Sequence, residues 1–222
     1  MPNQAYEVTT RAGTDAASAL IRNTYLLLSL TLLFSAATAA FAMALDLRGP
    51  GLLLTMVGYF GLLFAVNALR NSAWGILAVF ALTGFMGFTL GPIINLYLHA
   101  FGNGHQLVMM ALGGSGAIFL GLSAYALTSR RDFSFLGGFL FAGVMVAFLA
   151  GLAAVFLHLP ALSLAVSSMF VLLMSASILY QTSALVHGGE TNYLLATVSL
   201  YLSLYNLFLS LLQIGGFVSG DD

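Results

Sequence analysis

The sequence has no cysteine, no lysine and few charged residues of either sign. Without cysteine, the chain forms no disulfide and supplies neither a thiolate nucleophile nor a cysteine ligand for a metal. Six basic residues against seven acidic ones leave a net charge of -1, which offers no basic surface to nucleic acid. Charged residues make up 6% of the chain, whereas soluble domains contain about a quarter. These absences exclude a nucleic-acid-binding protein and an ordinary soluble domain.

Apolar residues are what the chain has in abundance. They make up 60% of its 222 residues, and the mean hydropathy is +1.02, which predicts a polytopic membrane protein. The first 22 residues are polar, whereas a secretory signal peptide places its apolar core close to the N-terminus. We therefore expect Met1 to Arg22 to form a flexible tail and the first apolar run to remain as a membrane helix.

Seven apolar runs have roughly the ~20 residues needed to cross a ~30 Å hydrocarbon core. Short polar breaks separate them, including the turn at Gly188-Gly189, and such short links make consecutive helices antiparallel neighbours. The prediction is an all-α bundle of seven transmembrane helices within residues 23–218. The helices are expected at about 24–45, 50–68, 73–98, 105–127, 134–156, 161–186 and 192–216.

The arginines predict the orientation of this bundle, because cytoplasmic loops carry an excess of basic residues. With the N-terminus inside, only Arg48 falls in an outer loop, and after seven crossings the C-terminus is periplasmic. The predicted location is the bacterial inner membrane. The arginines on the cytoplasmic side are then Arg11, Arg22, Arg70, Arg130 and Arg131.

Glycines are concentrated in the third and fourth predicted helices. Small residues let membrane helices approach closely, so we expect tight packing at both helices. Gly91-Pro92 also removes a backbone hydrogen bond, which predicts a kink in the third helix. The glycines are Gly84, Gly87 and Gly91 in the third helix, and Gly113, Gly114, Gly116 and Gly121 in the fourth.

Neither catalysis nor metal binding is indicated by the remaining motifs. Gly113-Gly114-Ser115-Gly116 is similar to the setting of an intramembrane serine nucleophile, but no histidine falls within a membrane helix to activate Ser115. The histidines show no HExxH or paired spacing, so no zinc or di-iron ligand set is predicted. We expect a protein without enzymatic activity and without a cofactor. The four histidines are His99, His105, His158 and His187.

Polar side chains recur on one face of each of the last two helices. A membrane helix does not expose amides to lipid, because an unpaired amide in hydrocarbon costs several kcal/mol. The two faces therefore predict either interhelical hydrogen bonds or a narrow wet cavity. The residues are Ser163, Ser167, Ser177 and Gln181 on the sixth helix, and Ser199, Ser203, Asn206, Ser210 and Gln213 on the seventh.

Three segments carry a resemblance to a known family. They are Ile178 to Ser183, His187 to Tyr193 and Leu200 to Phe208, supported by Asp132 to Gly138 and by Arg22 to Tyr25. The chain resembles the Bax inhibitor-1 (transmembrane Bax inhibitor motif) family, and within it the bacterial YccA branch. The resemblance implies a seven-helix inner-membrane protein that binds and restrains the membrane-anchored AAA protease FtsH in membrane-protein quality control.

Another branch of the family implies the alternative function, a pH-sensitive leak for Ca²⁺ or another cation such as H⁺. In that branch two aspartates and an arginine form a latch; motif matching places the aspartates at Gln181 and Ser203 and the arginine near Arg70. Neither an amide nor a hydroxyl titrates near neutral pH, so the dicarboxylate latch is absent here. The candidate interior polar site comprises Arg70, Gln181, Ser203, Asn206 and Glu190.

The tail has a predicted role if the chain restrains an AAA protease. An AAA protease needs a segment to engage, and some twenty extended residues reach up to about 70 Å. A chain that is engaged at Met1 to Arg22 but is difficult to extract would occupy the protease. An idle tail remains the alternative.

Overall fold

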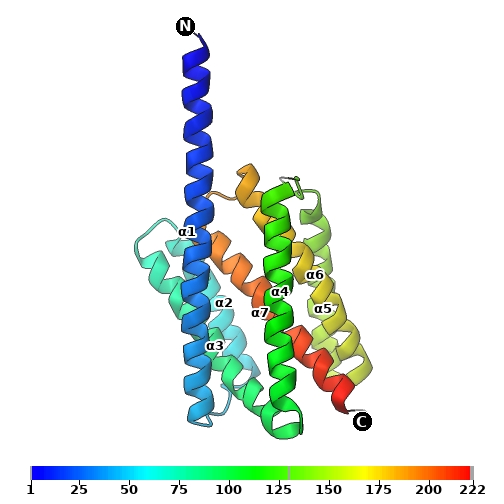
Figure 1. Ribbon diagram of the computed structural model, residues 1–222. Coiled ribbons are helices and arrows are strands. Elements are labelled where there is room, and N and C mark those ends of the chain that lie inside the picture. The colour runs from blue at the N-terminus through cyan, green and yellow to red at the C-terminus, as the bar shows by residue number, and fades with distance from the viewer. Residues whose placement is uncertain (1, 130, 221–222) are drawn as a thin grey trace.

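Seven α-helices make up most of the described chain (Figure 1). The computed structural model describes residues 2–129 and 131–220, with side chains from residue 17 onward. All seven helices are long and apolar enough to cross a membrane, which confirms the predicted all-α class with seven membrane helices; the orientation of the termini stays a prediction. The helices are α1 (Pro2–Ala44), α2 (Leu52–Leu69), α3 (Trp74–Ala100), α4 (Gly104–Ser129), α5 (Leu136–Phe156), α6 (Pro160–His187) and α7 (Tyr193–Gly220).

The packed part of α1 extends closer to the N-terminus than residue 24. Leu20 and Ile21, which precede the predicted start of the first span, pack against the hydrophobic core. Helix α1 includes residues 2–22 of the predicted tail, Met1 to Arg22. Most of it falls on residues 1–16, whose side chains lie outside the described part, so its flexibility and its role stay predictions.

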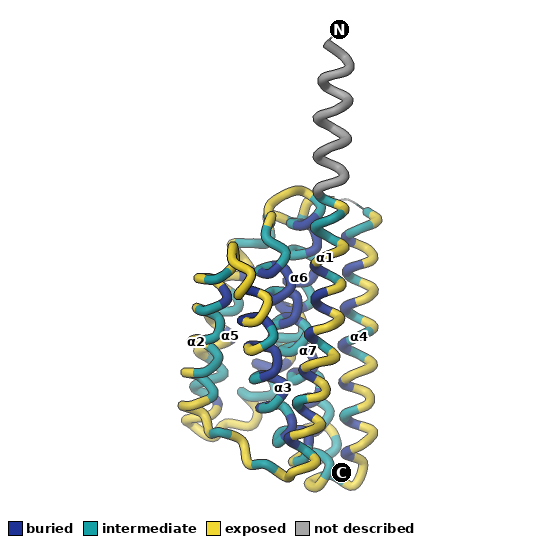
Figure 2. Tube along the Cα trace, turned by 90° about the vertical axis from the view of Figure 1, so that its left-hand side faces the viewer, coloured by how far each residue is buried: buried dark blue, intermediate teal, exposed yellow. Residues whose placement is uncertain are grey.

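Helix α7 occupies the centre of the bundle (Figure 1). It packs against α1, α2, α3, α4 and α6, and Leu200, Tyr201, Leu207 and Leu212 are almost completely buried in it. Helix α2 is peripheral by contrast, with Val66 as its buried residue. Figure 2 shows exposed residues on the outer faces of α1, α2 and α4 and buried residues toward the interior. The exposed apolar faces suit contact with lipid.

Close packing of α1 on α3 depends on the glycines of α3, as predicted. A Cβ built on Gly87 would lie 2.2 Å from the carbonyl oxygen of Ser35, and one on Gly91 would lie 2.7 Å from that of Ala39. Both distances are shorter than any normal contact, so these positions admit only hydrogen. Helix α3 continues through Pro92 to Ala100, and the predicted kink at Pro92 stays a prediction.

The glycines of α4 behave differently, and the expectation of tight packing is wrong for three of them. A Cβ on Gly113, Gly116 or Gly121 would meet nothing within 4 Å. Gly113 and Gly121 are exposed on the outside of the bundle. Glycine permits close approach only where a second helix is present, and no neighbour in the described chain covers this face.

Candidate functional site

The two positions that correspond by resemblance to an acidic pair lie together between α6 and α7. The amide nitrogen of Gln181 lies 3.0 Å from the Ser203 hydroxyl, and the amide oxygen lies 3.3 Å from it. Ser203 is buried and Gln181 is half-buried. The pair is hydrogen-bonded and uncharged, so it has no group that gains or loses a proton near neutral pH.

Glu190 lies in the tight turn that joins α6 to α7. Gly188 adopts a left-handed conformation with φ of 76° and ends α6, as the Gly-Gly sequence predicts. One carboxylate oxygen of Glu190 accepts the backbone N–H groups of Thr191 at 2.8 Å and Asn192 at 2.7 Å. The side-chain oxygen of Asn192 then caps the first turn of α7 by accepting from Leu194 at 3.0 Å. Glu190 therefore shapes the turn, and among the described residues it makes no hydrogen bond to Gln181 or Ser203.

Arg70 is exposed just after the end of α2. Its guanidinium donates to the side-chain oxygen of Asn67 at 3.3 Å, and its backbone carbonyl accepts from the side chain of Asn192 at 2.9 Å. Among the described residues no hydrogen bond joins Arg70 to Gln181 or Ser203. Arg70 thus ties the end of α2 to the start of α7 through its main chain.

The polar stripe of α7 continues toward the other end of the bundle, where it meets α6 again. The Ser167 hydroxyl donates to the amide oxygen of Gln213 at 2.7 Å. The amide nitrogen of Gln213 donates to the Ser163 hydroxyl. Asn206 donates to the carbonyl oxygen of Leu202 at 2.8 Å, within its own helix. The predicted interhelical hydrogen bonds therefore form at two levels, one on each side of Asn206.

A crevice of about 290 Å³ opens between α5, α6 and α7, beside the hydrogen-bonded side chains of Ser163, Ser167 and Gln213. Helices α5 and α7 both pack on α6, and within the described chain they do not pack on each other. Apolar side chains of α5, including Phe148 and Val155, form one wall. The polar residues that line it are Ser163, Ser167, Asn206, Ser210 and Gln213.

The structure also shows an important polar residue that sequence reasoning missed. The Tyr201 hydroxyl lies 2.6 Å from the Ser35 hydroxyl and donates to the carbonyl oxygen of Thr83 at 3.3 Å. It therefore joins α7 to α1 and α3, although only 1% of the residue is exposed. In the sequence Tyr201 stands in an apolar run. The one signal of its role is that hydroxyl residues also occur in the helices that face it.

Replacement of Tyr201 by Phe tests this junction. We expect the free energy of unfolding in detergent to fall by about 1 kcal/mol, because Ser35 and the Thr83 carbonyl lose a partner in an apolar interior. Thermal unfolding followed by circular dichroism measures the change. Tyr180→Phe is the matched control, since the Tyr180 hydroxyl has no partner among the described residues. Equal effects of the two substitutions would contradict the assignment.

The loop between α4 and α5 is attached to the last turns of α6. The Ser183 hydroxyl accepts the backbone N–H of Phe133 at 3.0 Å. Asp132 accepts the N–H of Ser134 at 2.8 Å, and this backbone bond, helped by the nearby His187, lowers the pKa of the Asp132 carboxyl. The carboxylate is therefore ionised at neutral pH and stabilises the loop locally.

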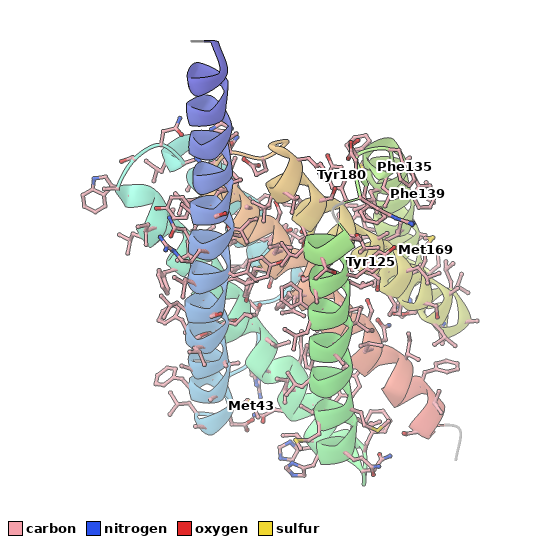
Figure 3. All side chains as sticks on the ribbon, turned by 45° about the horizontal axis from the view of Figure 1, so that its top comes forward. Met43, Tyr125, Phe135, Phe139, Met169 and Tyr180 are labelled. Carbon is pink, nitrogen blue, oxygen red and sulfur yellow. The ribbon has the colours of Figure 1, made fainter. Side chains whose placement is uncertain are left out.

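Aromatic side chains gather at the same end of the bundle. Tyr125, Phe135, Phe139 and Tyr180 come from the end of α4, the start of α5 and the end of α6 (Figure 3). The Tyr180 ring lies against Gly137, where an added Cβ would come within 3.3 Å. Aromatic rings at helix ends are typical of the membrane interface, so this group indicates where the bilayer boundary lies.

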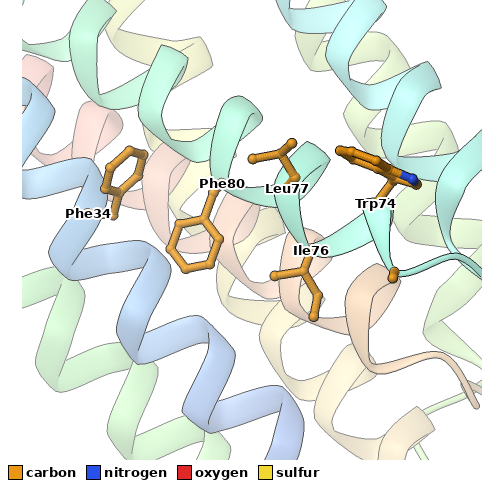
Figure 4. Close-up of a pocket in the computed structure, with 6 residues that line it drawn as sticks. Phe34, Trp74, Ile76, Leu77 and Phe80 are labelled. Atoms are coloured by element: carbon orange, nitrogen blue, oxygen red, sulfur yellow. The ribbon is translucent and has the colours of Figure 1, made fainter.

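An apolar hollow of about 690 Å³ lies at the outer surface between α1 and α3 (Figure 4). Phe34 and Phe80 meet edge to face across it, with ring centroids 5.4 Å apart. Trp74, Ile76 and Leu77 form the rest of its lining with Ala73. Its lining is apolar apart from the indole N–H of Trp74, and such a surface suits lipid.

Ser115 does not have the surroundings of a nucleophile. It is buried, and its hydroxyl donates to the carbonyl oxygen of Leu112 at 3.1 Å within α4. Among the described residues no three His, Asp or Glu side chains come together as a metal site would require. The polar contacts between α6 and α7 thus remain the candidate functional site.

The sequence is similar to those of known proteins over most of its length. A family model described as inhibitor of apoptosis-promoting Bax1 matches residues 17–220. The modulator of FtsH protease YccA from Escherichia coli K12 is 55% identical over 202 residues, 91% of each chain. The inner membrane protein YccA of Escherichia coli O6:H1 shows the same identity and coverage. The Golgi anti-apoptotic protein of vaccinia virus is 34% identical over 208 residues, 88% of this chain and 84% of the viral one.

Proposed function

The chain belongs to the Bax1-I family of inhibitors of apoptosis-promoting Bax1, and we propose from this membership that it binds and restrains a membrane-anchored AAA protease of the FtsH type. The observation that carries the proposal is its 55% identity, over 91% of both chains, to a protein named as a modulator of FtsH protease. Like that relative's counterpart in another strain, it is a multi-pass inner-membrane protein.

The proposed orientation places the N-terminus in the cytoplasm. The α2–α3 and α4–α5 loops lie at the same end of the bundle as the α6–α7 turn, and the α1–α2 loop lies at the opposite end with the C-terminus (Figure 1). By sequence, Arg70 and Arg131 belong to the first two loops and Arg48 to the α1–α2 loop, whereas Arg22 lies in the half of α1 remote from that loop. This distribution favours the first end as cytoplasmic. The loop at Asp132, the turn at Glu190 and the start of α1 would then face a cytoplasmic protease together.

The packing of the bundle supports restraint through resistance to extraction. A protease that engages the N-terminus must first pull out α1, which packs on α3 through Gly87 and Gly91 and on α7 through Tyr201. Each membrane helix removed separately exposes its interhelical hydrogen bonds to hydrocarbon. The protease is therefore held by a substrate that it degrades slowly.

The cation-leak alternative finds less support at the site. The Gln181–Ser203 pair is uncharged, and the side chain of Arg70 bonds Asn67. A coupled pair of carboxylates, which is what would make a leak sensitive to pH, has no counterpart at these positions. We therefore retain protease modulation as the proposed function.

Deletion of residues 2–15 tests the role of the tail. In proteoliposomes that contain an FtsH-type protease and a fluorescent substrate, the full chain should slow substrate turnover several-fold. The deletion variant should restore most of the lost rate, because the protease can no longer engage it. A variant with residues 2–15 replaced by glycine and serine at equal length is the matched control for tail length.

The outcomes distinguish modulation of the protease from engagement through the tail. Unchanged inhibition by the deletion variant would contradict tail engagement and leave binding to the bundle. If the full chain neither co-purified with the FtsH-type protease nor slowed its substrate turnover, protease modulation itself would be overturned.

A further inference from the structure

The crevice between α5, α6 and α7 contains polar groups that have no hydrogen-bond partner among the described residues. Ser210 lines it and is only 6% exposed, yet its hydroxyl has no hydrogen-bond partner among the described residues. Asn206 donates once to Leu202, and its side-chain oxygen accepts from no described group. Neither the Ser210 Oγ nor the Asn206 Oδ1 is among the fully enclosed unpaired atoms of the described residues, so both are accessible from the crevice. An unpaired hydroxyl or amide in an apolar setting costs roughly 1–3 kcal/mol, which favours a hydrogen-bonding ligand here.

The crevice runs deep into the membrane. Helix α7 has 28 residues, or about 42 Å at ~1.5 Å per residue, so it exceeds a ~30 Å hydrocarbon core at its ends. Ser210 lies about 15 Å and Asn206 about 21 Å along the axis from Gly220. Asn206 is thus near the midplane of the bilayer, whereas Gln213 is exposed and lies closer to the end of α7 at Gly220, where the crevice opens.

The chemistry of the lining selects an uncharged ligand. Hydroxyls and amides offer both donors and acceptors, and no ionisable side chain lines the crevice. Lipid acyl chains cannot bond Ser210 or Asn206, and lipid ester groups lie at the interface, too shallow for Asn206. Water can reach both, and about 290 Å³ has room for several molecules.

We propose that this crevice is a hydrated binding site, entered from the end of the bundle that holds Pro160 and Gly220, which carries water and small uncharged hydrogen-bonding molecules to Asn206. Hydrogen bonds among Ser163, Ser167 and Gln213 fix the side chains at the entrance of the crevice. Ser210 and Asn206 bind the ligand along the inner wall. The site is independent of the proposed action on a protease.

The absence of cysteine makes a direct test possible, because single cysteines can be introduced without background. Ser210→Cys and Asn206→Cys are each reconstituted into proteoliposomes with silver ions on both sides of the membrane. Thiols that remain free are then counted with a fluorescent maleimide in SDS. Silver is small and travels in water, so neither reagent size nor orientation limits access.

Gly113→Cys supplies the control at matched depth. Gly113 is exposed on the lipid face of α4, about 14 Å from Gly104. A hydrogen bond of 3.1 Å between Asn103 and Ser219 places the start of α4 beside the end of α7. We expect Ser210→Cys and Asn206→Cys to react at least about tenfold faster than Gly113→Cys, since a thiol in hydrocarbon rarely ionises.

A plug variant shows that any reactivity arises in this crevice. Gly151 lies on its wall, and a Cβ there meets only Val166, at 3.6 Å, so Gly151→Leu projects into the space without a backbone clash. In the Ser210→Cys background it should lower the reaction rate several-fold. Gly138→Leu, on the open face of the same helix, should not. The proposal would be overturned if both crevice cysteines reacted with silver no faster than Gly113→Cys. It would also be overturned if Gly151→Leu left the reaction rate of Ser210→Cys unchanged.

Discussion

Gly87→Leu will separate α1 from α3 and leave little correctly folded protein in the membrane. A Cβ at this position lies 2.2 Å from the Ser35 carbonyl oxygen and 2.3 Å from the Thr38 hydroxyl. Because one of these atoms belongs to the backbone of α1, a rotamer change cannot relieve the overlap. The cost should exceed the ~1–3 kcal/mol that is typical of overpacking in a core.

The expected result is loss of the monodisperse peak in size-exclusion chromatography and faster proteolysis of the purified variant. Gly116→Leu and Gly121→Leu are matched controls, because a Cβ at either position meets nothing within 4 Å. They add apolar surface where lipid can receive it. Normal folding of Gly87→Leu would show that α1 does not pack on α3 as described.

The double substitution Gln181→Asp with Ser203→Asp will make the stability of the protein depend on pH. The Gln181 amide nitrogen and the Ser203 hydroxyl are 3.0 Å apart in the parent, so carboxylates at these two positions lie close together and cannot both be ionised without strong repulsion. As the pH rises from below ~4, where both groups are protonated, the folded variant must bury a charge while the unfolded chain does not. Its stability therefore falls by ~3 kcal/mol or more.

The parent pair cannot ionise, so its unfolding temperature should change much less between pH 5 and pH 8. Unfolding temperatures in detergent at several pH values measure the difference. Gln181→Asn with Ser203→Asn is the uncharged control, with side chains of the same length as aspartate. A double-aspartate variant whose stability follows that of this control across the pH range would contradict the interaction between positions 181 and 203.

The helices and their order were predictable because each depends on local sequence alone. Roughly ~20 apolar residues in succession must form a helix in lipid, where every backbone group needs an internal partner. The turn at Gly188 was equally predictable, since glycine readily accepts a left-handed conformation. Gln181 and Ser203 could be expected to face each other because α6 and α7 are joined by this short turn.

The start of the first span was less accessible to prediction. The apolar residues just before Arg22 belong with it, but this short stretch looks like part of a polar terminus when only its composition is considered. Its membership follows from Leu20 and Ile21 packing on the core. Arg70 shows the same limitation, because the resemblance placed it near the pair whereas its side chain bonds Asn67. Glu190 was grouped with the pair as a polar residue at a helix end, and its carboxylate bonds the turn.

Sequence alone determined that this is a seven-helix membrane protein of the Bax inhibitor type, with an uncharged pair where an acidic one could stand. Only the tertiary structure decided that Tyr201 joins three helices, that Gly87 is covered whereas Gly113 is open, and that Ser210 lines a crevice. The physical reason is that lipid and protein interior are both apolar. An apolar run therefore predicts a membrane helix without showing which face meets a neighbour, and that distinction arises only when the helices pack.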